Sequence, residues 1–356
     1  MLSVLFFAAI TATGAAAPLF AQLAPSPDAS PVSNAPAPSE DDQAMTTLKV
    51  NVNLVNLYFT AKDHNGELVP HLTRQDCSVT EDKQPQTLKN FQAITNQPLT
   101  LGILLDTSGS QQRLLPLEQQ FGGEFLDHVL KPHDQAFLIS FDVDIDLLQD
   151  FTNNPHTLER AMNKAQINIG GGSVGIPGIG RGPVPTTGAP KGTLLYDAIY
   201  QTSNDKLSQE TGRKAIIILT DGEDQGSEVK ITDAIQAAQK ANVIVYVILI
   251  ADRGFYNGFG YGGDFAMKRI STETGGRLID VGNNGKKLEA AFLQIEDELR
   301  TQYVATYTPT NNKLDGTYRH VAVACKTEPS GADKPEDLKI QVRQGYYAIA
   351  TDNSAN

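Results

Sequence analysis

Short apolar runs alternate with segments of helical spacing through the middle of the chain. Five runs are almost entirely apolar, as in strands buried on both faces: LTLGILLD, QAFLISFD, KAIIILTD, NVIVYVILIA and GRLIDV. Between and after them, five segments place apolar residues at helical spacing: LEQQFGGEFLDHVL, TLERAMNKAQ, TLLYDAIYQTSN, ITDAIQAAQKA and KKLEAAFLQIEDELRTQ. Apolar strands that alternate with helices indicate a mainly parallel sheet covered on both faces. We therefore predict a doubly wound α/β domain over residues 97–300.

Strand patterns flank this domain on both sides. Residues 47–96 alternate apolar and polar positions and contain an Asn-Gly turn, and residues 301–350 carry further alternating runs separated by a turn and a polar loop. Each flank holds too few strands for a stable sandwich of its own. We expect the two flanks to pair into one small β-sandwich-like domain.

The first residues predict export. Residues 1–22 are apolar and Ala-rich and end in small residues, which is typical of a secretory signal peptide. Residues 23–46 are rich in Pro, Ala and Ser and are predicted to be a disordered linker, because they contain too little apolar surface to offset the entropy of ordering. We expect no membrane span in the mature chain and a location in the periplasm, at the cell surface or outside the cell.

Charge and cysteine content narrow the choice of partner and compartment. The formal net charge of -12 argues against nucleic-acid binding, which depends on clustered Lys and Arg. The two cysteines, Cys77 and Cys325, can form a disulfide in an oxidising compartment or remain two buried thiols. Pairing of the two flanks would place both in one domain, which favours the disulfide.

Oxygen-bearing side chains follow the ends of the predicted core strands. Asp106, Ser108 and Ser110 stand at alternate positions after the first apolar run, Asp221 closes a second one, and Thr193 opens a helix. Ligands of open parallel sheets bind at the carboxyl ends of the strands. Hydroxyl and carboxylate oxygens suit Mg²⁺, with Mn²⁺ or Ca²⁺ as alternatives. We predict a metal site made of these five residues.

This set of residues resembles the metal-ion-dependent adhesion site (MIDAS) of von Willebrand factor type A (VWA) domains. The resemblance covers about residues 99–300 in the order of motifs and elements. It implies that Ser108, Ser110 and Thr193 bind the metal directly and that Asp106 and Asp221 often act through waters. It also implies that an Asp or Glu carboxylate of a partner protein fills the open coordination position.

The flanks extend the resemblance. VNVNLVNLYFTAKDHNGELVPHLTRQDCSVTEDKQPQTLKNF and ELRTQYVATYTPTNNKLDGTYRHVAV, with VRQGYYA, are similar to exported acidobacterial VWFA-related proteins over about residues 47–348. Two features depart from that pattern: the Gly/Pro-rich loop of residues 169–192 is longer, and Cys77 replaces a common aromatic residue. The longer loop affects whether Thr193 reaches the metal. Cys77 suggests a disulfide peculiar to this chain.

We accordingly expect a non-enzymatic, metal-dependent binding module for adhesion or envelope assembly. The alternative is a hydrolase that forms a phosphoaspartate at Asp106, because such enzymes use an Asp at a strand end. They generally have a second acidic residue two positions on, where this chain has Ser108. Neither Ser108 nor Ser110 stands in a Gly-x-Ser-x-Gly elbow, and the chain lacks a phosphate-binding loop motif.

Overall fold

The computed structural model describes most of the chain from residue 54 onward. The described ranges are residues 54–94, 97–167, 192–251, 263–327 and 335–348. The predicted signal peptide, the predicted linker and residues 169–191 of the Gly/Pro-rich loop lie outside them. Within the described ranges, no helix is long and apolar enough to cross a membrane.

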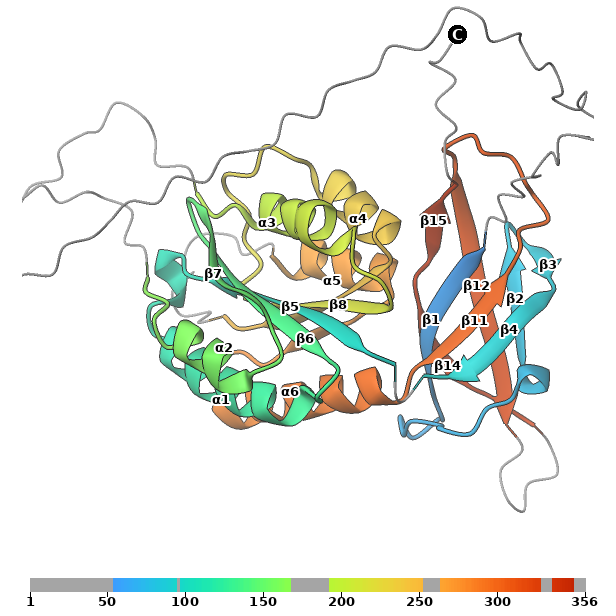
Figure 1. Ribbon diagram of the computed structural model, residues 1–356, viewed down its shortest axis with the longest axis horizontal. Helices are drawn as coiled ribbons and strands as arrows, with labels where there is room; N and C mark the ends of the chain where they lie inside the picture. Colours follow the sequence, from blue (N-terminus) through green and yellow to red (C-terminus); the bar gives the residue numbers. More distant parts are fainter. Residues whose placement is uncertain (1–53, 95–96, 168–191, 252–262, 328–334, 349–356) are drawn as a thin grey trace, which may run out of the picture. The chain divides into compact units, whose positions relative to one another are not determined.

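A six-stranded sheet forms the centre of residues 97–300, the α/β region (Figure 1). Its strands, in spatial order, are β10 (Leu278–Asp280), β9 (Val243–Leu249), β8 (Arg213–Thr220), β5 (Leu99–Asp106), β6 (Gln135–Phe141) and β7 (Ile145–Thr152). Neighbouring strands are parallel except for β7, which runs antiparallel to β6. Every residue of β5, β8 and β9 is buried, as their continuous apolar sequence predicts.

Helices cover both faces of this sheet (Figure 1). One face carries α1 (Leu115–Val129), α2 (Pro155–Met162) and α6 (Gly285–Arg300). The other carries α3 (Leu195–Gln201), a π-helical continuation (Thr202–Leu207), α4 (Ile231–Lys240) and α5 (Gly263–Thr274). Local sequence fixes the helix starts: Pro116 occupies the first turn of α1, and the Asn284 side chain accepts a hydrogen bond from the Lys287 amide to cap α6. The predicted doubly wound α/β architecture is confirmed.

The segments on either side of the α/β region form two antiparallel sheets, which together are the flanking β region. The first sheet has the order β14 (Lys339–Val342), β1 (Val55–Lys62), β11 (Tyr303–Tyr307), β4 (Leu88–Ala93). The second contains β13 (Glu336–Asp337), β12 (Tyr318–Thr327), β2 (Cys77–Glu81) and β3 (Gln84–Gln86), with β15 (Gly345–Tyr347) also paired to β12. A short 3₁₀ helix (Arg74–Asp76) precedes β2. Both sheets contribute to one hydrophobic core, and both mix strands from the two flanks.

This arrangement confirms the predicted pairing of the flanks, with more strands than the sequence pattern indicates. The sequence CSVTEDKQPQTLKNFQAI predicts two strands about a turn at residues 82–85, but β2, β3 and β4 are three, because Gln84–Gln86 forms a short strand of its own. The apolar pattern changes phase between Leu54 and Val55, and in the structure Leu54 is exposed whereas Val55 is buried and begins β1. Whether the flanking β region folds as a separate domain stays a prediction.

A disulfide joins the two flanks. Cys77 on β2 and Cys325 on β12 are directly opposite in the antiparallel register, with their Cα atoms 4.1 Å apart. Their positions agree with the alternation along β12, where Val321, Val323 and Cys325 all face the core. The predicted disulfide is confirmed, and it closes a loop with a sequence separation of 248 residues.

Candidate metal centre

The candidate centre lies at the carboxyl edge of the sheet, where the chain changes direction. β5 is flanked by β6 on one side and by β8 on the other. From β5 the chain continues to β6 and β7, and it then returns to form β8, β9 and β10 on the opposite side. The loops after β5 and β8 therefore diverge at the position where ligands bind in such sheets.

Asp106 is the last residue of β5, and its side chain is fully buried. Oδ1 accepts a hydrogen bond of 3.0 Å from the Ser108 amide, and Oδ2 accepts one of 2.6 Å from Oγ1 of Thr220. Each carboxylate oxygen has a second lone pair that can accept from a water or bind a cation. The carboxylate is thus held in one orientation at the end of the central strand.

Ser108 and Ser110 lie in the turn that follows, and both are half-buried. Their Oγ atoms are 3.0 Å apart, so both hydroxyls reach the same small volume. Gln111 ends the single 3₁₀ turn of this loop and is fully buried. Its Nε2 donates to the carbonyl of Ile250 at 3.1 Å, which attaches the loop to the end of β9.

Thr193 precedes α3 and is half-buried. Its carbonyl accepts hydrogen bonds from the amides of Gln225 at 3.1 Å and Gly226 at 3.2 Å, both in the loop that Asp221 begins. The next residue, Leu194, donates its amide to the carbonyl of Asp142, just after β6. The backbone at Thr193 is therefore fixed between the loops that follow β8 and β6.

Asp221 follows the last residue of β8 and is 2% exposed. Its Oδ1 accepts a hydrogen bond from the Glu223 amide at 3.2 Å. Gly222 adopts φ +86°, and a Cβ there would lie 3.1 Å from Cα of Gly263 and 2.9 Å from Cγ of Met267. The Asp-Gly step is therefore needed both for a left-handed backbone and for close approach of the first turn of α5.

Three carboxyl groups, those of Asp106, Glu118 and Asp221, are buried beneath these loops. Burial, and then the charge of Asp221, raise the pKa of Asp106 to about 7. Glu118 on α1 is fully buried, neither of its carboxylate oxygens has a hydrogen-bond partner, and its pKa is raised well above the usual value by burial and then by Asp106 and Asp221. Three buried carboxylates close enough to repel one another favour a cation in the same place.

Sequence reasoning missed two of the residues that shape this centre. Thr220 orients Asp106, and Glu118 adds a third carboxylate. Glu118 does leave a signal in the sequence, because it occupies a core-facing position of α1 together with Leu115, Gly122 and Phe125. An acidic residue on the apolar face of a helix is costly unless it has a specific role.

The strand order, the antiparallel edge strand β7 and the residues at the carboxyl edge define the α/β region as a VWA fold. In this fold the loops after β5 and β8 and the start of α3 carry Asp106, Ser108, Ser110, Thr193 and Asp221. The five predicted ligands thus lie on three loops, which hydrogen bonds and electrostatic contacts join at one edge of the sheet.

Several solved structures are similar to this chain at low identity. BatB from Bacteroides thetaiotaomicron matches with 17% identity and a TM-score of 0.42, over 57% of this chain and 99% of that one. A von Willebrand factor type A protein from Catenulispora acidiphila matches with 10% identity and a TM-score of 0.44, over 86% of this chain and 76% of that one. Proximal thread matrix protein 1 from the mussel byssus, with a zinc-occupied MIDAS motif, matches with 14% identity and a TM-score of 0.45. The match covers 62% of this chain and 50% of that one.

No protein-family model and no curated protein matches the sequence. The strand order and the loops at the sheet edge, rather than these low structural similarities, define the fold. The similarity to acidobacterial VWFA-related proteins stays a prediction from the sequence.

Proposed function

We propose that this chain is an exported protein-binding module that grips an acidic group of a partner protein through Mg²⁺ at the carboxyl edge of the sheet. One observation carries the proposal: Asp106, Glu118 and Asp221 are buried together beneath the neighbouring hydroxyls of Ser108 and Ser110. Burial raises the pKa of Asp106 and of Glu118, and a bound cation would offset the cost of ionising both groups.

The donor set fits a hard divalent cation. Ser108, Ser110 and Thr193 would bind it through their hydroxyls, and Asp106 and Asp221 would bind directly or through water, with Mn²⁺ or Ca²⁺ as alternatives to Mg²⁺. The cation would supply positive charge with one open coordination position. Three of these ligands are neutral, so a carboxylate from outside the chain would complete its coordination. A partner that offers Asp or Glu at its surface suits this position.

Export is supported by the disulfide between Cys77 and Cys325. Such bonds persist in oxidising compartments and are rare in the cytosol. We propose that the chain works in the periplasm, at the cell surface or outside the cell, where adhesion or envelope assembly would use a metal-dependent contact.

Hydrolysis through a phosphoaspartate is less well supported. Asp106 is fully buried, and both of its oxygens already accept hydrogen bonds, from the Ser108 amide and from Thr220. A nucleophile needs an oxygen that can reach the phosphorus atom in line with the leaving group. We therefore propose binding rather than catalysis.

Isothermal titration of MgCl₂ into the purified chain tests the metal site. We expect binding that Ser110→Ala and Thr193→Ala both weaken strongly. His156→Ala is the matched control, because ligand atoms of Asp127, His156 and Glu159 lie within 4.8 Å of one another in a second, largely exposed group that could bind a cation. Binding that is lost in His156→Ala and kept in Ser110→Ala would contradict the proposal.

The partner's carboxylate is tested with glutarate as a stand-in. If a carboxylate completes the coordination, excess glutarate should tighten the binding of Mg²⁺, because coupling between two ligands is reciprocal. Glutaramide, which has the same length without charge, should have no such effect. Equal effects of the two compounds would show that no carboxylate takes part.

A further inference from the structure

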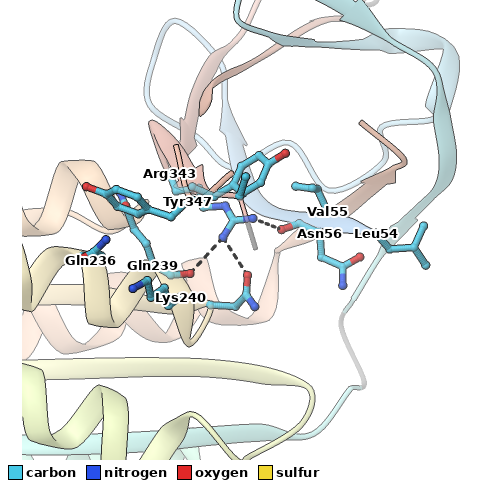
Figure 2. A pocket seen from close by; sticks show the side chains of 12 residues that line it. Leu54, Val55, Asn56, Gln236, Gln239, Lys240, Arg343 and Tyr347 are labelled. Atoms are coloured by element: carbon cyan, nitrogen blue, oxygen red, sulfur yellow. Dashed lines mark hydrogen bonds between the residues drawn. The ribbon is translucent and has the colours of Figure 1, made fainter. Parts of the chain in front are cut away.

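A second pocket lies away from the metal centre, where the end of α4 faces β1 and β15 of the flanking β region (Figure 2). Its volume is about 440 Å³, which is within the range of small-molecule sites. The described residues that line it include two cations, Arg343 and Lys240, and neither Asp nor Glu. A pocket with this charge composition favours an anion.

Arg343 is the central charge of this pocket, and it is only 8% exposed. Its Nη1 donates to Oδ1 of Asn242 at 2.8 Å and to the carbonyl of Gln239 at 3.4 Å, and its Nη2 donates to the carbonyl of Asn56 at 3.1 Å (Figure 2). All three acceptors are neutral. Its Nε has no hydrogen-bond partner, and the ion pairs recorded among the described residues do not include it.

A buried guanidinium whose contacts are all neutral is costly, because burial disfavours the charged form. In agreement with this, burial lowers the pKa of Arg343, although four nearby tyrosines oppose the shift. The ring of Tyr346 lies 5.4 Å from the guanidinium and covers one face of it. Glu81 contacts this same tyrosine, since it accepts the Tyr346 hydroxyl at 2.8 Å, but Glu81 does not line the pocket.

Lys240 adds a second, exposed cation at the rim. It is the last residue of α4, and its Nζ lies 6.0 Å from the centre of the Tyr347 ring. The end of α4 carries about half a negative charge from its terminal carbonyls, and Arg343 and Lys240 together supply two positive charges. The sum of these three charges is therefore positive by more than one elementary charge.

The other residues that line the pocket indicate which further groups a bound anionic ligand would carry. Side-chain amides of Asn56 and Gln236 can donate and accept hydrogen bonds, and Leu54 and Val55 offer apolar surface. The two N–H groups of Nη1 are taken by Asn242 and Gln239, so a carboxylate would bind through the remaining N–H of Nη2 and through the ammonium group of Lys240. We propose that this pocket binds a carboxylate-bearing ligand of about dipeptide size, with Arg343 and Lys240 as its anion-binding residues. This site is independent of the proposed metal centre.

Titration calorimetry with acetyl-dialanine, set beside its C-terminal amide, tests this site in the full chain. Acetyl-dialanine should bind and the amide should not, because only the acid carries the charge. Lys240→Gln should weaken binding about tenfold, as expected for the loss of one charged contact. Lys286→Gln removes an exposed lysine of α6 outside the pocket and should leave binding unchanged.

Lys240 is the better target than Arg343, because its exposed side chain can be changed without disturbing the core. Arg343→Lys keeps the charge and loses the planar fork, so its binding should also weaken if the variant folds. Equal binding of the acid and the amide would overturn the proposal, as would a Lys240→Gln variant that binds like the parent. Excess MgCl₂ should not change the affinity, which separates this site from the metal centre.

Discussion

Thr220 and Asp106 are joined across the point where the sheet changes direction. Oγ1 of Thr220, the last residue of β8, donates a 2.6 Å hydrogen bond to Oδ2 of Asp106, the last residue of β5. The same Oγ1 accepts the amide of Gly222 at 3.0 Å. One buried hydroxyl therefore orients a proposed metal ligand and the backbone beside a second one, Asp221.

Thr220→Val should lower the free energy of unfolding by about 1–3 kcal/mol, because it leaves a buried carboxylate oxygen and a backbone amide without this partner. It should also weaken the binding of Mg²⁺. Thr60→Val is the matched control, since Oγ1 of Thr60 is buried without a hydrogen-bond partner. Urea unfolding of both variants measures their free energies of unfolding. An equal loss of free energy in both would mean that the Thr220 hydrogen bonds do not contribute to stability.

Glu118→Gln should stabilise the metal-free chain at alkaline pH by about 1–3 kcal/mol, because the ionised carboxylate is buried without partners. The variant should gain less thermal stability from MgCl₂ than the parent does. Glu124→Gln changes an exposed glutamate on the same helix and should alter neither property. Thermal melts with EDTA and with MgCl₂ measure both effects. A Glu118→Gln variant with lower stability in EDTA would contradict this account of Glu118.

Asp106 should contribute less stability to the metal-free chain as the pH rises from 3.8 to about 7. The folded chain holds the Asp106 proton more tightly than the unfolded chain does, because the pKa of Asp106 is raised from 3.8 to about 7 by burial and then by Asp221. Asp106→Asn cannot titrate, so the slope of stability against pH should shrink by at most about 1.4 kcal/mol per pH unit. Urea unfolding in EDTA across this range measures the slope. Parallel curves for parent and variant would show that Asp106 has no raised pKa.

Gly222→Ala should destabilise the chain by more than Gly66→Ala does. Both glycines have a left-handed backbone, with φ +86° and +89°, but a Cβ at Gly66 meets no atom within 4 Å. The Gly66 variant should therefore show only the backbone cost of about 1–2 kcal/mol. The difference between the two unfolding free energies measures the close packing of α5 against the Asp221 loop. A difference near zero between these free energies would mean that α5 can move away from the Asp221 loop without loss of stability.

Cys77→Ser combined with Cys325→Ser should lower the free energy of unfolding by about 5 kcal/mol, because the bond closes a long loop in the unfolded chain. Reductant should have a similar effect on the parent and none on the double variant, since the chain contains 2 cysteines. Urea titrations with and without reductant measure this. A double variant as stable as the parent would contradict a stabilising role for the bond.

The sequence contains enough information to place the proposed ligands at one edge of the sheet. Asp106 and Asp221 end continuous apolar runs, and such runs become neighbouring parallel strands whose carboxyl ends meet. The pattern also favours a disulfide between Cys77 and Cys325, because strands on both flanks need each other to bury their apolar faces, and the structure confirms it.

Other features depend on contacts that no local pattern encodes. The place of Glu118 on the apolar face of α1 indicates that it is buried, but only the packing of α1 against the sheet brings it near Asp106. The pocket at Arg343 likewise depends on three segments far apart in the chain, which meet where β1 and β15 face α4. Periodicity predicts which face of an element is buried, and it does not predict which element lies against that face.

The disulfide also determines how the molecule would carry mechanical load. Tension applied between residues 54 and 348 would travel along the backbone to Cys77, cross the sulfur atoms to Cys325, and leave through the last strands. Residues 78–324, which include every proposed metal ligand, lie outside this covalent path. A pulling force would therefore act on the strands before Cys77 and after Cys325, while the loops of the proposed metal centre stay outside the loaded covalent path.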